Sequence, residues 1–207
     1  MKCKNATETT GEKEMLIVAE QKKQRALAPA GAAQTAICVS VVEYGSKMDV
    51  DKFEKERTQA IFDVTFELPD SPITINGQEE PRWVRQRFWL NCKKEQMGRD
   101  IKKQFGKLLD NYDELAKQGK TLQEVLLGLP ALINIEHEKG YCKVTDLVKM
   151  PEKMAKDLKP QSEVWSYDPS DPNTNWDKLQ PWQQKEVKAH PEYKIAKGEV
   201  DGETDNF

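Results

Sequence analysis

The sequence lacks the features that mark membrane and secreted proteins. Its 207 residues contain no apolar run of about 18 residues, so no membrane-spanning helix is expected. The apolar stretch nearest the N-terminus, residues 15–19, is too short for the core of a signal peptide. We therefore expect a non-secreted, cytoplasmic protein with no membrane partner.

The sequence also lacks the residue patterns that mark metal binding or catalysis. The four cysteines, Cys3, Cys38, Cys92 and Cys142, lack the two-to-four-residue spacing of zinc ligands. The two histidines lie far apart, and no phosphate loop or nucleophile elbow is present. We expect no catalytic residues, no metal and no cofactor. The cysteines within or beside strand-like runs are interpreted as small core residues in a reducing compartment.

Charge is plentiful but unevenly distributed, although the formal net charge is only −3. Residues 82–107 contain nine basic side chains, opposed only by Glu95 and Asp100, whereas the last nine residues contain four acidic side chains and no basic one. A basic region combined with an acidic tail is typical of proteins that bind polyanions.

The first half of the chain predicts strands. Residues 36–44 are β-branched and apolar and stop at Gly45, and the charged residues 46–58 resemble a loop. Residues 60–68 alternate between apolar and mixed positions, as in a half-buried strand. Turn signals at 69–72 and at Asn76-Gly77 precede a third strand over residues 82–90.

A helical period follows, and then two more strands. Residues 97–109 carry an apolar stripe with helical spacing, and Thr121 with Glu124 forms a capping box for a short helix. Residues 131–137 and 141–148 read as a hairpin. The segment after residue 160, rich in proline and tryptophan, is expected to pack on another surface, with one short helix within 179–193.

This order predicts a mainly β fold, a five-stranded OB-fold barrel with a helical insert between strands 3 and 4. A generic five-stranded α+β domain would give a similar order. We divide the chain into a polar N-terminal extension (1–33), the barrel domain (34–150), a Pro/Trp-rich extension that packs on or beside the barrel (151–197) and a disordered acidic tail (198–207).

One face of the third strand combines aromatic rings with cations. The rings can stack on unpaired bases and the cations can bind phosphates, so the pattern indicates a single-stranded nucleic-acid site. The expected DNA-binding residues are Trp83, Arg85, Arg87, Trp89, Tyr141, Lys143, Lys102 and Lys103. The alternative is that the tryptophans cover a barrel end and that the charged residues are solvated surface.

The C-terminus ends in an aromatic residue within an acidic segment. Such a peptide can place its ring in an apolar pocket of a partner and its carboxylates against basic residues, and it can also compete with DNA for the protein's own groove. The residues expected to do this are Asp201, Glu203, Asp205 and Phe207. The alternative is a tail that only improves solubility.

From Ala32 to Tyr193 the chain resembles a family of phage-encoded single-stranded DNA-binding proteins. The resemblance is carried by residues 42–45 (VEYG), 66–69 (FELP), 126–138 (LLGLPALINIEHE), 179–182 (LQPW) and 190–193 (HPEY). It implies an oligonucleotide-binding fold and a role in phage DNA replication or recombination inside the bacterial host. The lysine-rich residues 93–110 and the long polar N-terminus depart from the family pattern.

The sequence thus predicts a non-enzymatic, sequence-tolerant single-strand binder. Its expected partners are single-stranded DNA and, through the tail, replication or recombination proteins. Homo-oligomerisation is left open. A second hypothesis is a protein-interaction module that uses the same Trp/Arg strand as its interface. A nuclease is disfavoured because no cluster of metal-binding carboxylates occurs in the sequence, while strand annealing stays open.

Overall fold

The computed structural model describes residues 27–50 and 55–199. The strands are β1 (Gly31–Val50), β2 (Glu56–Glu67), β3 (Ile73–Ile75), β4 (Gln78–Glu80), β5 (Trp83–Asn91), β6 (Pro130–Glu138), β7 (Tyr141–Lys149) and β8 (Trp165–Tyr167). The helices are α1 (Lys94–Phe105), α2 (Tyr112–Lys117), α3 (Leu122–Leu126), α4 (Glu152–Ala155), the 3-10 helix η1 (Trp176–Lys178), α5 (Pro181–Val187) and α6 (Pro191–Ala196). The expected mainly β fold, with helices between its third and fourth long strands, is confirmed.

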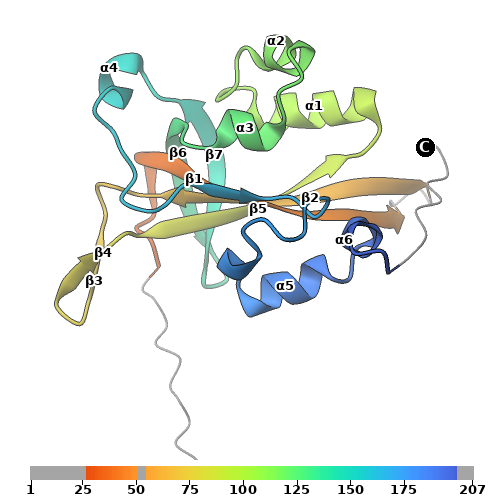
Figure 1. Ribbon diagram of the computed structural model, residues 1–207. Helices are drawn as coiled ribbons and strands as arrows, with labels where there is room; N and C mark the ends of the chain where they lie inside the picture. Colours follow the sequence, from red (N-terminus) through yellow and green to blue (C-terminus); the bar gives the residue numbers. More distant parts are fainter. Residues whose placement is uncertain (1–26, 51–54, 200–207) are drawn as a thin grey trace, which may run out of the picture.

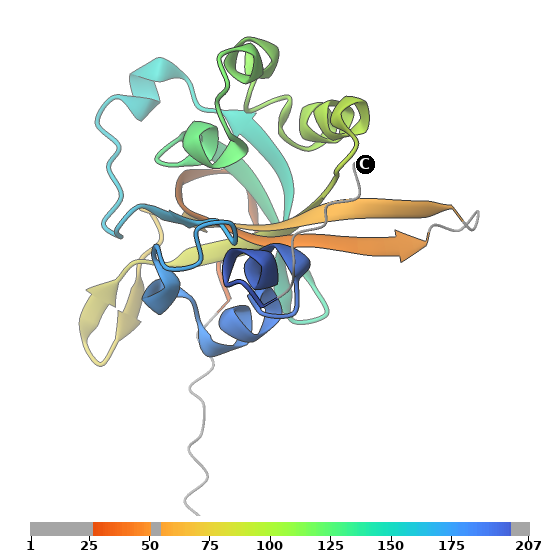
Figure 2. The same ribbon diagram turned by 45° about the vertical axis from the view of Figure 1, so that its right-hand side comes forward.

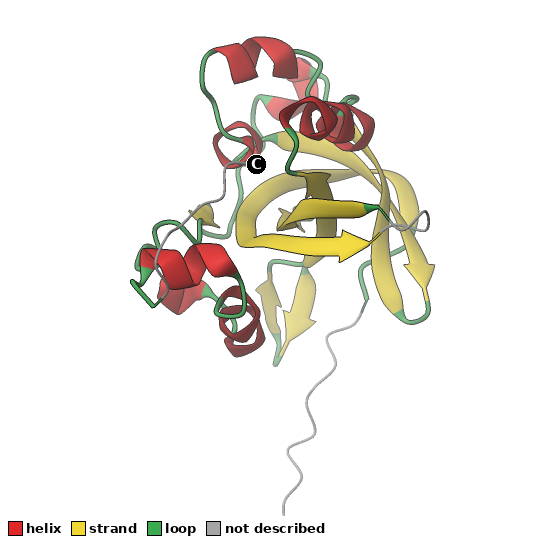
Figure 3. Ribbon diagram, turned by 90° about the vertical axis from the view of Figure 1, so that its right-hand side faces the viewer, coloured by secondary structure: helices red, strands yellow, loops and turns green. Residues whose placement is uncertain are grey.

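The main sheet runs in the order β5-β2-β1-β6-β7, with antiparallel neighbours, and β8 pairs parallel with β1. The sheet is strongly curled (Figure 3), so that its two outer strands, β5 and β7, come into contact. At this seam the backbone N–H of Val144 donates to the Gln86 side-chain oxygen at 3.1 Å. A side chain therefore forms a bridge between the two outer strands.

The concave side of the sheet and helices α1 and α3 enclose an apolar core. Phe66, Phe105, Leu126 and Ile133 are fully buried there. Figure 1 shows α1, α2 and α3 on one side of the strands and α5 and α6 on the other. The predicted capping box begins α3, where Thr121 accepts from the Glu124 backbone N–H. A local capping motif therefore determines where α3, one of the helices that cover this core, begins.

A second core lies on the opposite face of β1 and β2. Val42, Tyr44 and Ile61 pack there against side chains of the C-terminal extension, including Tyr167 and Val187. The prediction of a half-buried β2 is wrong, because its second face, which carries Ile61, Asp63 and Glu67, is buried as well. The physical reason is that β8, α5 and α6 fold back over this face, a contact that periodicity cannot reveal.

The expected loop over residues 46–58 is also wrong in part. Strand β1 continues to Val50 and β2 begins at Glu56, so the two form a long projecting arm (Figure 2). The register between β1 and β2 shifts at two bulges, one of them between Glu43 and Gly45. Gly45 has a φ of 110° and bends the strand without ending it.

Three further outcomes concern turns, a helix and a cysteine. Asn76-Gly77 and Lys139-Gly140 have positive φ, as tight hairpin turns require. The single helix expected within 179–193 is two helices, α5 and α6, because Pro191 begins a new one. Cys38 is buried as expected, but Cys92 is exposed at the end of β5 and is not a core residue.

Candidate functional site

Strand β5 alternates as its sequence predicts. Val84 and Phe88 point into the apolar core, while Trp83 and Trp89 lie on the outer face, 42% and 49% exposed. The Trp83 ring nitrogen donates to the Ser162 hydroxyl at 2.8 Å. A residue of the C-terminal extension therefore helps to fix this ring at the surface.

The two arginines on this face have different roles in the structure. The guanidinium of Arg87 donates to Asp63 at 2.8 and 3.3 Å and to Glu186 of α5 at 2.7 and 2.9 Å. Burial disfavours its charge, but the hydrogen bonds and charges of the two carboxylates outweigh burial and raise the pKa of Arg87. This arginine joins β2 to α5, so its donors are engaged inside the protein.

The carboxylate of Asp63 lies at the centre of this network and is almost fully buried. It accepts from the Tyr44 hydroxyl at 2.7 Å, and that hydroxyl accepts from the Gln183 side chain at 3.0 Å. Burial and the nearby Asp63 charge raise the pKa of Tyr44, which keeps it a neutral donor. The network therefore fixes α5 against the sheet through Gln183 and Glu186.

Arg85, by contrast, remains accessible. Its guanidinium lies 4.5 Å from the ring centroid of Trp182 on α5, and its Nε is 3.9 Å from Asp63. The side chain is 44% exposed. A planar cation held over an aromatic ring keeps its outward N–H groups available for a phosphate.

A groove of about 1170 Å³ joins these features. It runs between β5, the start of β7 and the C-terminal extension. Its aromatic lining residues are Trp83, Tyr141, Trp165 and Trp182, and its basic lining residues are Arg85, Arg87 and Lys178. Tyr141, at the β6–β7 turn, is 74% exposed. Rings and cations from segments far apart in the sequence thus share one depression.

Several of the predicted binding residues lie outside this groove. Lys143 pairs with Glu138 at 2.8 Å and Lys102 pairs with Asp113 at 2.7 Å. Lys102 and Lys103 are carried by α1, on the far side of the sheet from α5 (Figure 1). The structure therefore brings Trp83, Arg85 and Tyr141 together and separates the lysines of α1 from them. Trp89 lies on the same face of β5 beyond the groove lining.

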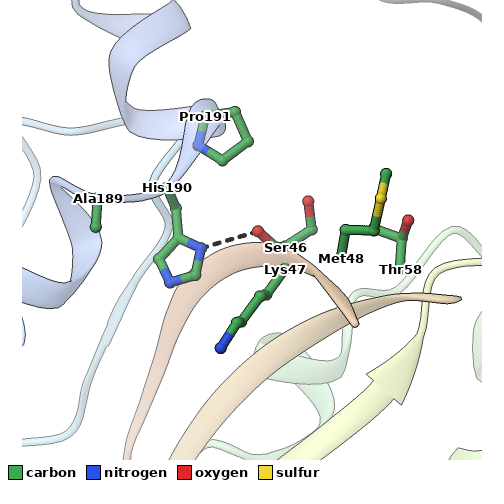
Figure 4. A pocket seen from close by; sticks show the side chains of 7 residues that line it. All are labelled: Ser46, Lys47, Met48, Thr58, Ala189, His190 and Pro191. Carbon is green, nitrogen blue, oxygen red and sulfur yellow. Dashed lines mark hydrogen bonds between the residues drawn. The ribbon is translucent and has the colours of Figure 1, made fainter. Parts of the chain in front are cut away.

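A second hollow, of about 420 Å³, lies at the base of the β1–β2 arm (Figure 4). His190 Nδ1 is 2.8 Å from the carbonyl oxygen of Ser46, and the Ser46 N–H donates to Glu192 at 2.9 Å. A Cβ at Gly45 would lie 2.5 Å from Glu192 Oε2. These contacts attach the arm to α6, and they give this hollow a structural role.

Sequence reasoning missed the residues that the extension contributes to the groove, above all Trp182 and Lys178. The cluster of tryptophans and prolines after residue 160 predicts packing on another surface but no contribution to a binding site. Trp182 follows the proline that begins α5, and the Gln180 N–H donates to the Gln183 side chain there. This helix-start signal could have placed the ring on a fixed helix, but it could not have indicated the groove.

Other predictions concern metals, the membrane and the tail. Within residues 27–50 and 55–199, no three histidine, cysteine or acidic side chains gather as metal ligands would. In the same residues, no helix has the length and apolar character needed to cross a membrane. The tail residues Asp201, Glu203, Asp205 and Phe207 lie outside the described residues.

Comparison of the chain with protein-family models, with curated proteins and with solved structures found no match.

Proposed function

We propose that the curled sheet is an oligonucleotide-binding barrel and that the groove binds single-stranded DNA. The strand order, the helices between β5 and β6 and the contact between β5 and β7 support the barrel. In barrels of this type the second and third strands and the hairpin loops form the binding face. Here β5, the third long strand, and the β6–β7 turn line the groove.

The proposal rests above all on one observation: exposed aromatic rings and an accessible cation line the same groove. Trp83 and Tyr141 offer aromatic faces on which unpaired bases stack, and Arg85 offers donors for a phosphate. Stacking is tolerant of sequence because every base has an aromatic face. The protein therefore coats single strands without reading their sequence.

The proposal includes the setting that the resemblance implies. The protein protects single strands exposed during phage DNA replication or recombination in the bacterial cytoplasm, and it acts without catalysis. The acidic tail, with Phe207 at its end, recruits replication or recombination proteins and competes with DNA for the groove. Deleting residues 200–207 is then expected to tighten binding of oligonucleotides, most strongly at low salt.

The test is a titration of the full-length protein with oligo-dT, followed by quenching of tryptophan fluorescence. Trp83→Ala and Tyr141→Ala are each expected to weaken binding by about 1–3 kcal/mol, the contribution of one stacked base. Ile195→Ala, which alters an exposed residue of α6 outside the groove lining, is the matched control. Equal affinity for duplex and single strands, or no quenching by oligo-dT, contradicts the proposal.

A further inference from the structure

The C-terminal extension is more than a cover for the second core, because it also forms a wall of the groove. Helix α5 is attached at two points: Gln183 donates to Tyr44, and Glu186 accepts from Arg87. Both contacts are short and lie at buried or half-buried positions. Hydrogen bonds of this kind fix position and orientation more strictly than apolar contact does.

Trp182 lies immediately before Gln183, so this attachment also sets the place of its ring. The side chain is 43% exposed although the next residue is buried. Part of the ring packs near Tyr44, at 6.3 Å between centroids, and the guanidinium of Arg85 lies 4.5 Å from its centre. The exposed part of Trp182 lines the same groove as Trp83 and Tyr141.

A single exposed aromatic ring is common on protein surfaces, whereas several exposed rings gathered in one patch mark an interaction surface. At this position the ring is rigidly held, lies beside an accessible cation and borders a groove with two other exposed rings. A ligand that presents both flat rings and phosphates satisfies all of these features, and a nucleic-acid strand is such a ligand.

We infer that Trp182 is a base-stacking residue of the single-strand site and that it also holds Arg85 in position for a phosphate. The site is therefore composite: the barrel supplies Trp83, Arg85 and Tyr141, and the extension supplies the opposite wall. This inference rests on the proposed function and adds to it the partner of Arg85 and the role of the extension.

The test compares Trp182→Leu with Trp182→Phe in the full-length protein. Leucine preserves apolar packing against Tyr44 but removes the aromatic face, whereas phenylalanine keeps a face. Trp182→Leu is expected to weaken oligo-dT binding by about fivefold to 100-fold, and Trp182→Phe by much less. Val187→Ala, which removes buried apolar contacts of α5 outside the groove lining, is the control for general loosening of the extension.

The positioning role has its own measurement. In a double-mutant cycle, Arg85→Ala is expected to cost less affinity when Trp182 is already leucine, because the guanidinium has then lost its platform. The slope of log affinity against log salt is expected to fall by about one in Trp182→Leu, as it does in Arg85→Ala. A merely structural role of Trp182 predicts additive effects and an unchanged slope.

The outcomes separate this inference from the proposed function. If Trp83→Ala weakens binding and Trp182→Leu does not, the composite site is overturned and the single-strand site on the barrel stands. If Val187→Ala weakens binding as much as Trp182→Leu, loosening explains the result and the inference fails. If the unaltered protein does not bind oligo-dT, both the inference and the proposed function fail.

Discussion

The two cores of this protein differ in how they are held together. The core enclosed by the curled sheet and α1 and α3 is apolar, with Phe66, Phe105 and Leu126 fully buried. The core beneath the C-terminal extension combines apolar side chains with the buried carboxylates of Asp63 and Glu67. The first depends on non-directional burial of apolar area, and the second depends on hydrogen bonds between particular atoms.

This difference bears on the proposed binding groove, which is lined by residues of the extension. Glu67 accepts from the backbone N–H groups of Gln161 and Ser162 at 2.7 and 2.8 Å, and Asp63 anchors Arg87. Each of these polar contacts fixes one element of the groove wall. An apolar core alone could hold the extension in place but would leave its angle to β5 less strictly determined.

The largest effect is expected from Asp63→Ala. The change leaves the half-buried guanidinium of Arg87 with one carboxylate and removes the acceptor of Tyr44, at a cost of about 3–5 kcal/mol in the free energy of unfolding. Urea denaturation measures this cost. The control is Asp146→Ala, which breaks the surface pair with Lys107 and is expected to cost less than about 1 kcal/mol. Similar values for the two variants would contradict a polar second core.

A comparable loss is expected from Leu126→Ala in the apolar core. Removing a fully buried leucine side chain destabilises a protein by about 2–5 kcal/mol. The informative difference is regional: Asp63→Ala should expose the extension to limited proteolysis first, while Leu126→Ala should lower the stability of the barrel as a whole. If both variants are cleaved at the same sites and rates, the two cores unfold as one unit.

A smaller effect separates the two arginines of β5. Arg85→Ala is expected to weaken oligo-dT binding by about tenfold and to change unfolding by less than 1 kcal/mol, because its side chain is exposed. Arg87→Ala is expected to lower the free energy of unfolding and to change oligo-dT binding much less. The stability falls because Asp63 then remains buried without that partner. Binding and urea denaturation of both variants test the assignment, and it is wrong if Arg87→Ala affects only binding.

The last effect concerns pH. Burial, with the negative charge of Asp168 next in weight, raises the pKa of Glu43 to about 7, although a hydrogen bond from Gln123 opposes the shift. The folded protein then binds a proton that the unfolded chain releases near pH 4.5. Stability is therefore expected to fall as pH rises from about 4.5 to 7, by about 1–3 kcal/mol.

Glu43→Gln removes this titration and is expected to flatten the pH dependence of stability over that range. Thermal unfolding followed at several pH values measures it, with Glu136→Gln on the exposed part of β6 as the control. A curve for Glu43→Gln parallel to that of the unaltered protein would show that Glu43 does not titrate in this window.

Prediction from the sequence was correct where the residues of a single segment are sufficient to define its local structure. The alternation of β5 correctly separated Trp83 and Trp89 from Val84 and Phe88, and Asn76-Gly77 marked a hairpin turn. The prediction of a loop over residues 46–58 was wrong in part, because the charged side chains of a two-stranded arm resemble those of a loop. The burial of Asp63 and Glu67 could not be predicted, because both carboxylates are satisfied by groups from other segments of the chain.

The sequence by itself determined the order of the five long strands, the core-facing side of β5 and the turns at Asn76-Gly77 and Lys139-Gly140, because these follow from periodicity and backbone preference over a few residues. Only the tertiary structure decided which of two arginines spaced two residues apart is structural and which is accessible. Arg87 meets Glu186, 99 residues away, while Arg85 meets Trp182. The equal spacing of the two arginines gives no sign of this difference, because their partners are brought to β5 only by the folding of the extension.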